Sequence, residues 1–97
     1  MKLRWTERAR QDLIEIGRYI AQDQPGAARR WVETLRNQAR RAVEFPNSGR
    51  KVPEFDREDL REIIVRGYRI VYLLRGETVE VLTVFEGHRL LRWSEEA

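Results

Sequence analysis

Apolar and polar residues alternate through the second half of the chain. β-Branched and aromatic residues dominate three runs, at 61–66, 68–74 and 78–86, and short polar segments that contain Gly67 and Gly76 separate these runs. Runs of this length with glycine at the reversals are typical of sequential antiparallel strands. The pattern therefore predicts a three-stranded meander.

The two faces of this predicted sheet differ in polarity. One set of alternate positions is largely apolar and comprises Ile63, Val65, Tyr68, Ile70, Tyr72, Leu74, Val79, Val81, Thr83 and Phe85. The opposite set is charged at the strand ends but apolar in the centre, at Ile64, Val71, Leu73, Leu82 and Val84. A sheet with one face in water would not place so many apolar residues there, so we expect helices or another chain to cover this second face as well.

Ahead of the predicted sheet, the hydrophobic spacing changes to that of helices. Residues 2–5 form a short strand candidate, and the hydroxyl of Thr6 can cap a first helix. One apolar stripe follows at helical spacing and consists of Ala9, Leu13, Ile16 and Ile20. Gly17 lies inside this helix at a cost of about 1 kcal/mol relative to Ala, which close approach of a second helix would explain.

A second helix is predicted to begin at Pro25, because proline at the first helical position loses no hydrogen bond, and to end before Phe45. Its apolar residues share one arc, made of Ala28, Trp31, Val32, Leu35, Ala39, Ala42 and Val43. The other arc is basic and carries Arg29, Arg30, Arg36, Arg40 and Arg41. The short connection predicts antiparallel neighbouring helices with one apolar and one basic face.

The order of elements predicts the fold class. One strand, two helices and three strands make a β-α-α-β-β-β arrangement, which is an α+β fold with a helical hairpin packed on a small, mostly antiparallel sheet. The first strand could pair at either edge. At 97 residues, we expect one domain over 1–97. Residues 50–59 are expected to form a polar loop, and the tail from about residue 91 is expected to be disordered or ordered by a partner.

Composition removes several classes of function. The chain has no cysteine and one histidine, so a disulfide framework, a thiolate nucleophile and a zinc site are not expected, and neither is a cofactor. No apolar run approaches the length of a membrane span, and the first residues lack the apolar core of a signal peptide. The expected location is the cytoplasm, with no membrane partner.

The basic residues are almost all arginine. Arginine accounts for 17 of the 19 Lys and Arg residues, and the formal net charge is +3. Residues 1–50 hold 11 basic and 6 acidic side chains, whereas residues 51–97 hold 8 and 10. The planar guanidinium suits phosphate or carboxylate, which favours a nucleic acid or an acidic protein as partner. A solvated face in a genome that prefers arginine codons explains the same composition.

Five short segments go beyond composition. They are Pro25-Gly-Ala-Ala, Gly49-Arg-Lys-Val-Pro-Glu54, Leu60-Arg-Glu-Ile, Tyr68-Arg-Ile-Val-Tyr72 and the stretch from Val84 to His88. In this order and spacing, the chain resembles the ParE/RelE superfamily of toxins from type II toxin–antitoxin modules, from Trp5 to about Leu90. The Arg-rich, Lys-poor content and the spacing are closer to the ParE branch.

The resemblance implies a small bacterial toxin that forms a hetero-oligomer with a cognate antitoxin, whose acidic or amphipathic segment covers the toxin. Within the superfamily, ParE-like members inhibit DNA gyrase by binding, and RelE-like members cleave messenger RNA on the ribosome. A third possibility is a toxin-fold binding protein that keeps the antitoxin interface without toxicity.

The ribonuclease alternative names three residues by motif position. Cleavage needs a base for the ribose 2′-hydroxyl, a cation for the phosphorane and an acid for the leaving oxygen. The resemblance assigns these roles to Glu54, Arg69 and His88. Each residue also has a structural interpretation: Glu54 pairs with Arg50 or Arg57, Arg69 lies opposite an acidic residue of the sheet, and His88 bonds backbone at a strand end. Several ribonucleases have tyrosine directly after the histidine, where this chain has arginine.

Gyrase inhibition is therefore the favoured function, and it requires contact residues rather than catalytic ones. The target-binding candidates are the tail arginines Arg89 and Arg92. The antitoxin-binding candidates are apolar residues that lack an obvious core partner and arginines of the second helix: Ile14, Arg29, Arg36, Arg40, Leu90, Leu91 and Trp93.

Overall fold

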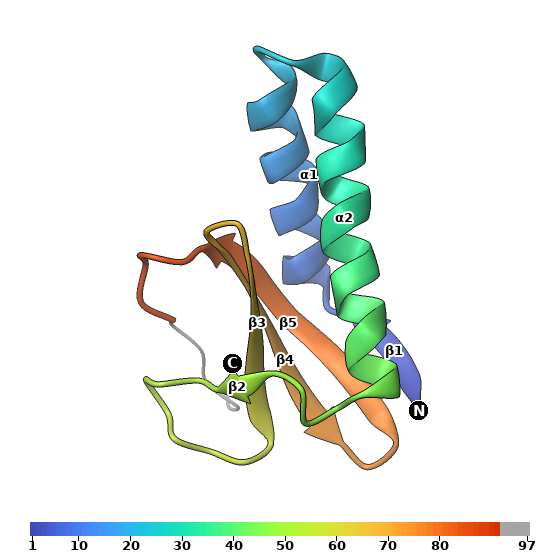
Figure 1. The fold of residues 1–97 in the computed structure, drawn as a ribbon, viewed down its shortest axis with the longest axis vertical. Coiled ribbons are helices and arrows are strands. Elements are labelled where there is room, and N and C mark those ends of the chain that lie inside the picture. Colours follow the sequence, from blue (N-terminus) through green and yellow to red (C-terminus); the bar gives the residue numbers. More distant parts are fainter. Residues whose placement is uncertain (92–97) are drawn as a thin grey trace.

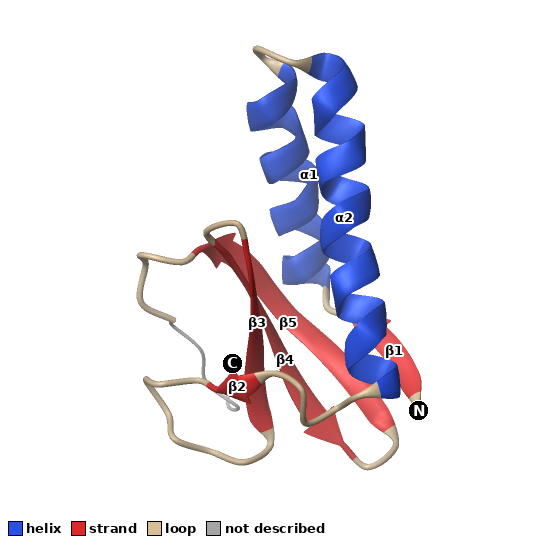
Figure 2. Cartoon of the chain, viewed as in Figure 1, coloured by secondary structure: helices blue, strands red, loops and turns tan. Residues whose placement is uncertain are grey.

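In the computed structural model, which describes residues 1–91, two helices pack on one face of a five-stranded sheet (Figures 1 and 2). The elements are β1 (Lys2–Trp5), α1 (Glu7–Ala21), α2 (Pro25–Glu44), β2 (Arg50–Lys51), β3 (Leu60–Val65), β4 (Tyr68–Arg75) and β5 (Thr78–Glu86). The strand order is β1-β5-β4-β3-β2, with β1 parallel to β5 and every other pair antiparallel. The predicted α+β class is confirmed, and the predicted strands of the meander are correct to within one residue.

The helical hairpin begins where the sequence predicts. Thr6 is the N-cap of α1, since its hydroxyl accepts from the Ala9 N–H (3.1 Å) and donates to the Leu82 carbonyl (2.8 Å). Gly17 allows the helices to approach closely, because a Cβ at this position would lie 3.3 Å from a methyl of Val32. The helical hairpin extends past the sheet at the end where α1 connects to α2 (Figure 1).

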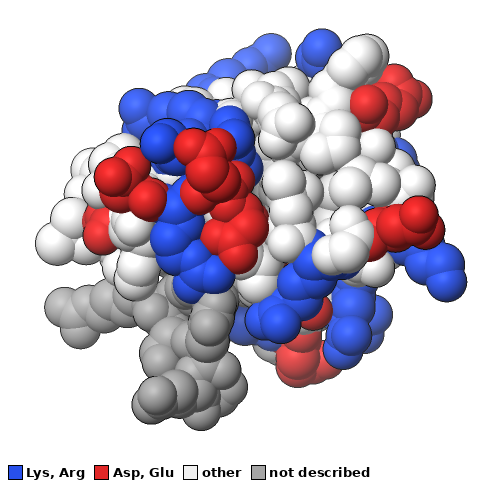
Figure 3. Space-filling view, turned by 90° about the horizontal axis from the view of Figure 1, so that it is seen from below, with Lys and Arg blue, Asp and Glu red and all other residues white. Residues whose placement is uncertain are grey.

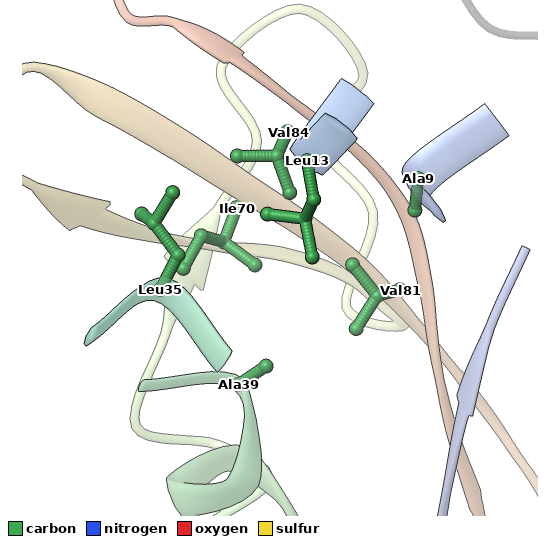
Figure 4. Packing of buried hydrophobic residues seen from close by; sticks show 7 residues of the cluster. All are labelled: Ala9, Leu13, Leu35, Ala39, Ile70, Val81 and Val84. Carbon is green, nitrogen blue, oxygen red and sulfur yellow. The ribbon is translucent and has the colours of Figure 1, made fainter. Parts of the chain in front are cut away.

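The main core lies between the helices and the sheet. Its buried side chains point toward one another from α1, α2, β4 and β5 (Figure 4) and are Ala9, Leu13, Leu35, Ala39, Ile70, Val81 and Val84. A second helix-side cluster, around Tyr72, continues this core toward the end of α2. The small residues of the helices meet the β-branched residues of the sheet, which brings the helices close to the strands.

A β-bulge corrects the assignment of faces along β5. The register shifts so that Val71 pairs with Thr83 while Tyr72 pairs with Val81, which leaves Leu82 as an extra residue. An extra residue reverses the alternation beyond it. Val84, expected on the second face, therefore packs against the helices, and Phe85, expected beneath the helices, packs on the second face.

The chain covers its own second face. Residues 50–59, expected to be a polar loop, begin with the two-residue strand β2, and Val52 and Phe55 pack against the sheet. The cluster on this face also contains Leu60, Val71, Leu73, Leu82, Leu91 and Phe85. The expectation that helices or another chain cover this face is wrong for most of it, although Ile64 remains 49% exposed.

A buried ion-pair network and two candidate interaction surfaces

The strongest polar cluster centres on Arg69 of β4. Its Nε donates to Glu62 Oε1 (2.6 Å), and its Nη1 and Nη2 donate to the two carboxylate oxygens of Glu54 (2.8 and 2.7 Å). The Arg69 side chain is 5% exposed, the Glu62 side chain is fully buried and that of Glu54 is 17% exposed. Arg50 Nε donates to the remaining oxygen of Glu62 (2.6 Å). Two carboxylates and two guanidiniums thus compensate one another.

This network also binds the backbone that follows β5. Arg69 Nη1 donates to the Arg89 carbonyl (2.9 Å), and the Leu91 N–H donates to Glu54 Oε2 (2.7 Å). The hydrogen bonds from Arg69 hold the pKa of Glu54 down at about 2, against a usual 4.5. Bonds to the same Glu54 carboxylate raise the pKa of Arg69 further above its already high value. Both groups stay charged at every physiological pH.

Two of the three residues named for ribonuclease chemistry are bound to each other. Glu54 and Arg69 meet, but they bind each other, and a carboxylate with so low a pKa is a weak proton acceptor. The imidazole of His88 is 76% exposed and pairs with Glu86 (3.4 Å). Arg69 lies beside Glu62 as its structural interpretation expects, whereas Glu54 pairs with Arg69.

The target-binding candidate that the structure describes lies on an exposed segment. The side chains of Arg89 and Leu90 are exposed, and Leu90 is 75% exposed. Leu91 is buried in the second-face cluster, so its expected role in an exposed surface is corrected. Arg92 and Trp93 lie outside the described residues.

Four of the antitoxin-binding candidates come together on the outer surface of the helical hairpin. We call this surface the helical groove. It consists of two adjoining hollows of about 340 and 380 Å³. Its apolar floor contains Trp5, Leu13, Ile14 and Val32, and the arginines at its rim are Arg10, Arg18, Arg29, Arg36 and Arg40.

Two rim arginines of the helical groove were missed by the sequence analysis. Arg10 and Arg18 lie four residues before and after Ile14, which is the spacing of neighbours on one helix face and could have identified them. Ile14 is 44% exposed. Arg40 pairs with Glu33 (3.6 Å), and among residues 1–91 no ion pair involves Arg29 or Arg36. The groove is therefore apolar with unneutralised positive charge at its edge.

The loop between β2 and β3 carries charges of both signs. Lys51 pairs with Asp56 (3.3 Å) and Glu58 (3.2 Å), and Glu58 also pairs with Arg61 (2.9 Å). In the view from below, acidic and basic side chains lie next to one another (Figure 3). This end of the molecule presents no large surface of a single sign.

Within residues 1–91 there is no group of three His, Cys, Asp or Glu residues suited to a metal ion, and no helix long and apolar enough to cross a membrane.

Comparison with known proteins gives concordant results. A family model described as the ParE toxin of the type II toxin-antitoxin system parDE matches residues 3–91. A protein of Sinorhizobium fredii (strain NBRC 101917 / NGR234) named "Putative toxin Y4kP" is 37% identical over 90 residues, which cover 91% of this chain and 90% of that protein. A chain of the chromosomal ParDE TA system from P. aeruginosa shares the fold, with a TM-score of 0.76 and 20% identity over 89% of this chain and 95% of that chain. The chain belongs to the ParE family of toxins from type II toxin–antitoxin systems.

Proposed function

We propose that this toxin inhibits DNA gyrase by binding it and transfers no proton itself. The observation that carries the proposal is the engagement of Glu54 and Arg69 with each other. Their charges and hydrogen bonds are used inside the fold, with Arg69 making four bonds to Glu54, Glu62 and the Arg89 carbonyl. A phosphate would have to displace a carboxylate from a buried guanidinium, which is unfavourable. Binding through exposed residues requires no such rearrangement.

Induction of the toxin alone, with separate readouts of DNA supercoiling and messenger cleavage, tests this proposal. The His88→Gln variant should stay toxic, because no proton transfer depends on this exposed imidazole and glutamine keeps a polar side chain of similar size at the edge of the surface. The double variant Arg89→Ala with Arg92→Ala should lose inhibition of supercoiling. Arg75→Ala is the matched control, since this exposed arginine lies at the opposite end of β4 and β5.

The alternative activity predicts a different result. A ribosome-dependent ribonuclease would cleave messenger RNA in the induced cells and would lose toxicity in the His88→Gln variant. That pair of outcomes would refute gyrase binding. Full viability after induction, with neither readout changed, would instead support the toxin-fold binding protein without toxicity.

The cognate antitoxin is the second proposed partner. The name of the structural relative, a ParDE TA system, and the family assignment support this pairing. The helical groove suits an amphipathic acidic segment, because its apolar floor can take the apolar side of a helix while its arginines face carboxylates. Co-expression with the product of an adjacent small acidic reading frame should yield a complex that the Ile14→Asp variant disrupts.

A further inference from the structure

The segment that follows β5 is held at several points along its backbone. The Gly87 N–H donates to the Gly67 carbonyl (2.6 Å), the Arg89 carbonyl accepts from Arg69, and the Leu91 N–H donates to Glu54. The side chain of Leu91 is buried at one end of the segment. Few degrees of freedom remain for the backbone between these anchors.

The side chains between the anchors face outward and line a cavity. This cavity, which we call the C-terminal pocket, has a volume of about 550 Å³ and is lined by Arg8, Phe85, His88, Arg89, Leu90 and Leu91. Its arginines give it a basic rim, while Phe85, Leu90 and Leu91 give it an apolar wall. Arg8 belongs to the first turn of α1, so two segments far apart in sequence form the pocket together.

We propose that the C-terminal pocket is the preformed docking site for an acidic segment of the target protein that inserts an apolar side chain. We further assign Glu54 and Arg69 as positioning residues that hold the pocket in shape. This inference rests on the proposed function, because the target is the gyrase that the toxin is proposed to bind. It extends that function by naming the surface and the chemistry of the bound segment.

The chemistry of the pocket favours protein over nucleic acid. Single strands bind through phosphate contacts combined with stacking of bases on open aromatic faces. Phe85 is the pocket's one aromatic residue within residues 1–91, and the Arg69 guanidinium lies over its ring at 5.0 Å. An acidic peptide needs no stacking surface, since the Arg89 guanidinium can bind its carboxylate and Leu90 can contact its apolar side chain.

The positioning role explains why a toxin that binds its target would contain a buried ion-pair network at this place. Arg69 and Glu54 hydrogen-bond to backbone atoms of residues 89 and 91, so they fix the path of the segment. A segment ordered before binding loses less conformational entropy when the target docks. Loss of this order should weaken binding even when every contact residue is intact.

Titration of purified gyrase with the full-length toxin tests both parts. Leu90→Ala removes the exposed apolar contact and should weaken binding by about tenfold, as should Arg89→Ala. Glu54→Gln should weaken binding by a similar factor and should speed hydrogen exchange of the Leu91 amide by more than its loss of global stability speeds exchange in β4. In the double variant with Arg89→Ala, Glu54→Gln should weaken binding much less than it does alone. Glu54 acts by positioning Arg89, so its substitution has little left to disturb once the Arg89 side chain is gone.

The possible failures are distinguishable. If wild-type toxin does not bind gyrase, the proposed function fails.

If it binds and Arg89→Ala weakens binding but Leu90→Ala does not, the pocket is not the docking site. If Leu90→Ala weakens binding while folded Glu54→Gln, with fast Leu91 exchange, binds as the wild type does, the positioning role is refuted. Leu90 is exposed, so its variant tests the pocket even if Glu54→Gln fails to fold. Weaker binding of Leu90→Ala to a single-stranded oligonucleotide, with gyrase affinity unchanged, would refute a protein ligand.

Discussion

The Glu54→Gln substitution separates a structural from a catalytic role of this carboxylate. Glutamine keeps an oxygen that can accept from the Leu91 N–H, but it removes the charge that faces Arg69 across 2.7 Å. Arg69 keeps its second carboxylate partner, Glu62. If the Glu54 carboxylate is structural, the variant should be less stable than the wild type. If the carboxylate is a catalytic base, the variant should be inactive but equally stable.

The size of the loss follows from the pKa of Glu54. Its lowering from 4.5 to about 2 is equivalent to about 3 kcal/mol of stability at neutral pH, since each unit corresponds to about 1.4 kcal/mol. Breaking a buried ion pair costs roughly 3–5 kcal/mol, and the remaining bond to Glu62 places this variant at the low end of that range. Because the folded-state pKa lies below the unfolded one, the contribution is complete above about pH 4.5 and disappears as the pH falls to about 2.

Urea unfolding followed by tryptophan fluorescence at a series of pH values measures this effect. The unfolding free energies of wild type and variant should differ by about 3 kcal/mol at pH 7 and should converge between pH 4.5 and 2. Glu58→Gln is the control, because the Glu58 side chain is 79% exposed and its removal should change stability little. Equal unfolding midpoints at pH 7, or a difference that persists unchanged to pH 2, would refute the reasoning.

Two further substitutions address the helical groove and the packing beneath β2. Replacing Arg29, Arg36 and Arg40 together with Gln should weaken antitoxin binding and flatten its salt dependence, with the melting temperature nearly unchanged; equal affinity at low and high salt would assign these arginines to solubility. Gly49→Ala should destabilise the fold by about 1–3 kcal/mol, because its Cβ would lie 2.5 Å from the Tyr72 hydroxyl. A melting temperature equal to that of the wild type would contradict this.

The sequence predicts the helices well because their signals are local. Thr6 and Pro25 mark the starts, and the spacing of apolar residues marks the buried stripe of each helix. The pairing of β1 is not local. A four-residue strand has too few side chains to indicate a partner, and its place beside β5 depends on contacts between residues more than 70 positions apart, such as that of Thr6 with Leu82.

The second face of the sheet shows a different limit of sequence analysis. Alternation predicts faces correctly until Leu82, where one extra residue exchanges the positions of Val84 and Phe85. A run of apolar residues does not reveal a bulge, because apolar side chains fill both faces of the sheet with or without the extra residue. Val52 and Phe55 are similarly hidden, since two apolar residues among many charges do not identify a segment that covers a sheet.

At the candidate site, the residue types can be read from the sequence but their contacts cannot. A glutamate and an arginine brought together are as suitable for catalysis as for structure, and the motifs that contain Glu54 and Arg69 cannot separate these uses. The contacts that favour structure come from backbone groups, the Leu91 N–H and the Arg89 carbonyl, whose positions no side chain encodes. Because these groups bind the pair to the end of the described chain, the residues best suited to phosphate chemistry instead fix the segment that carries Arg89 and Leu90. The path of the backbone after β5 therefore decides how the pair is used.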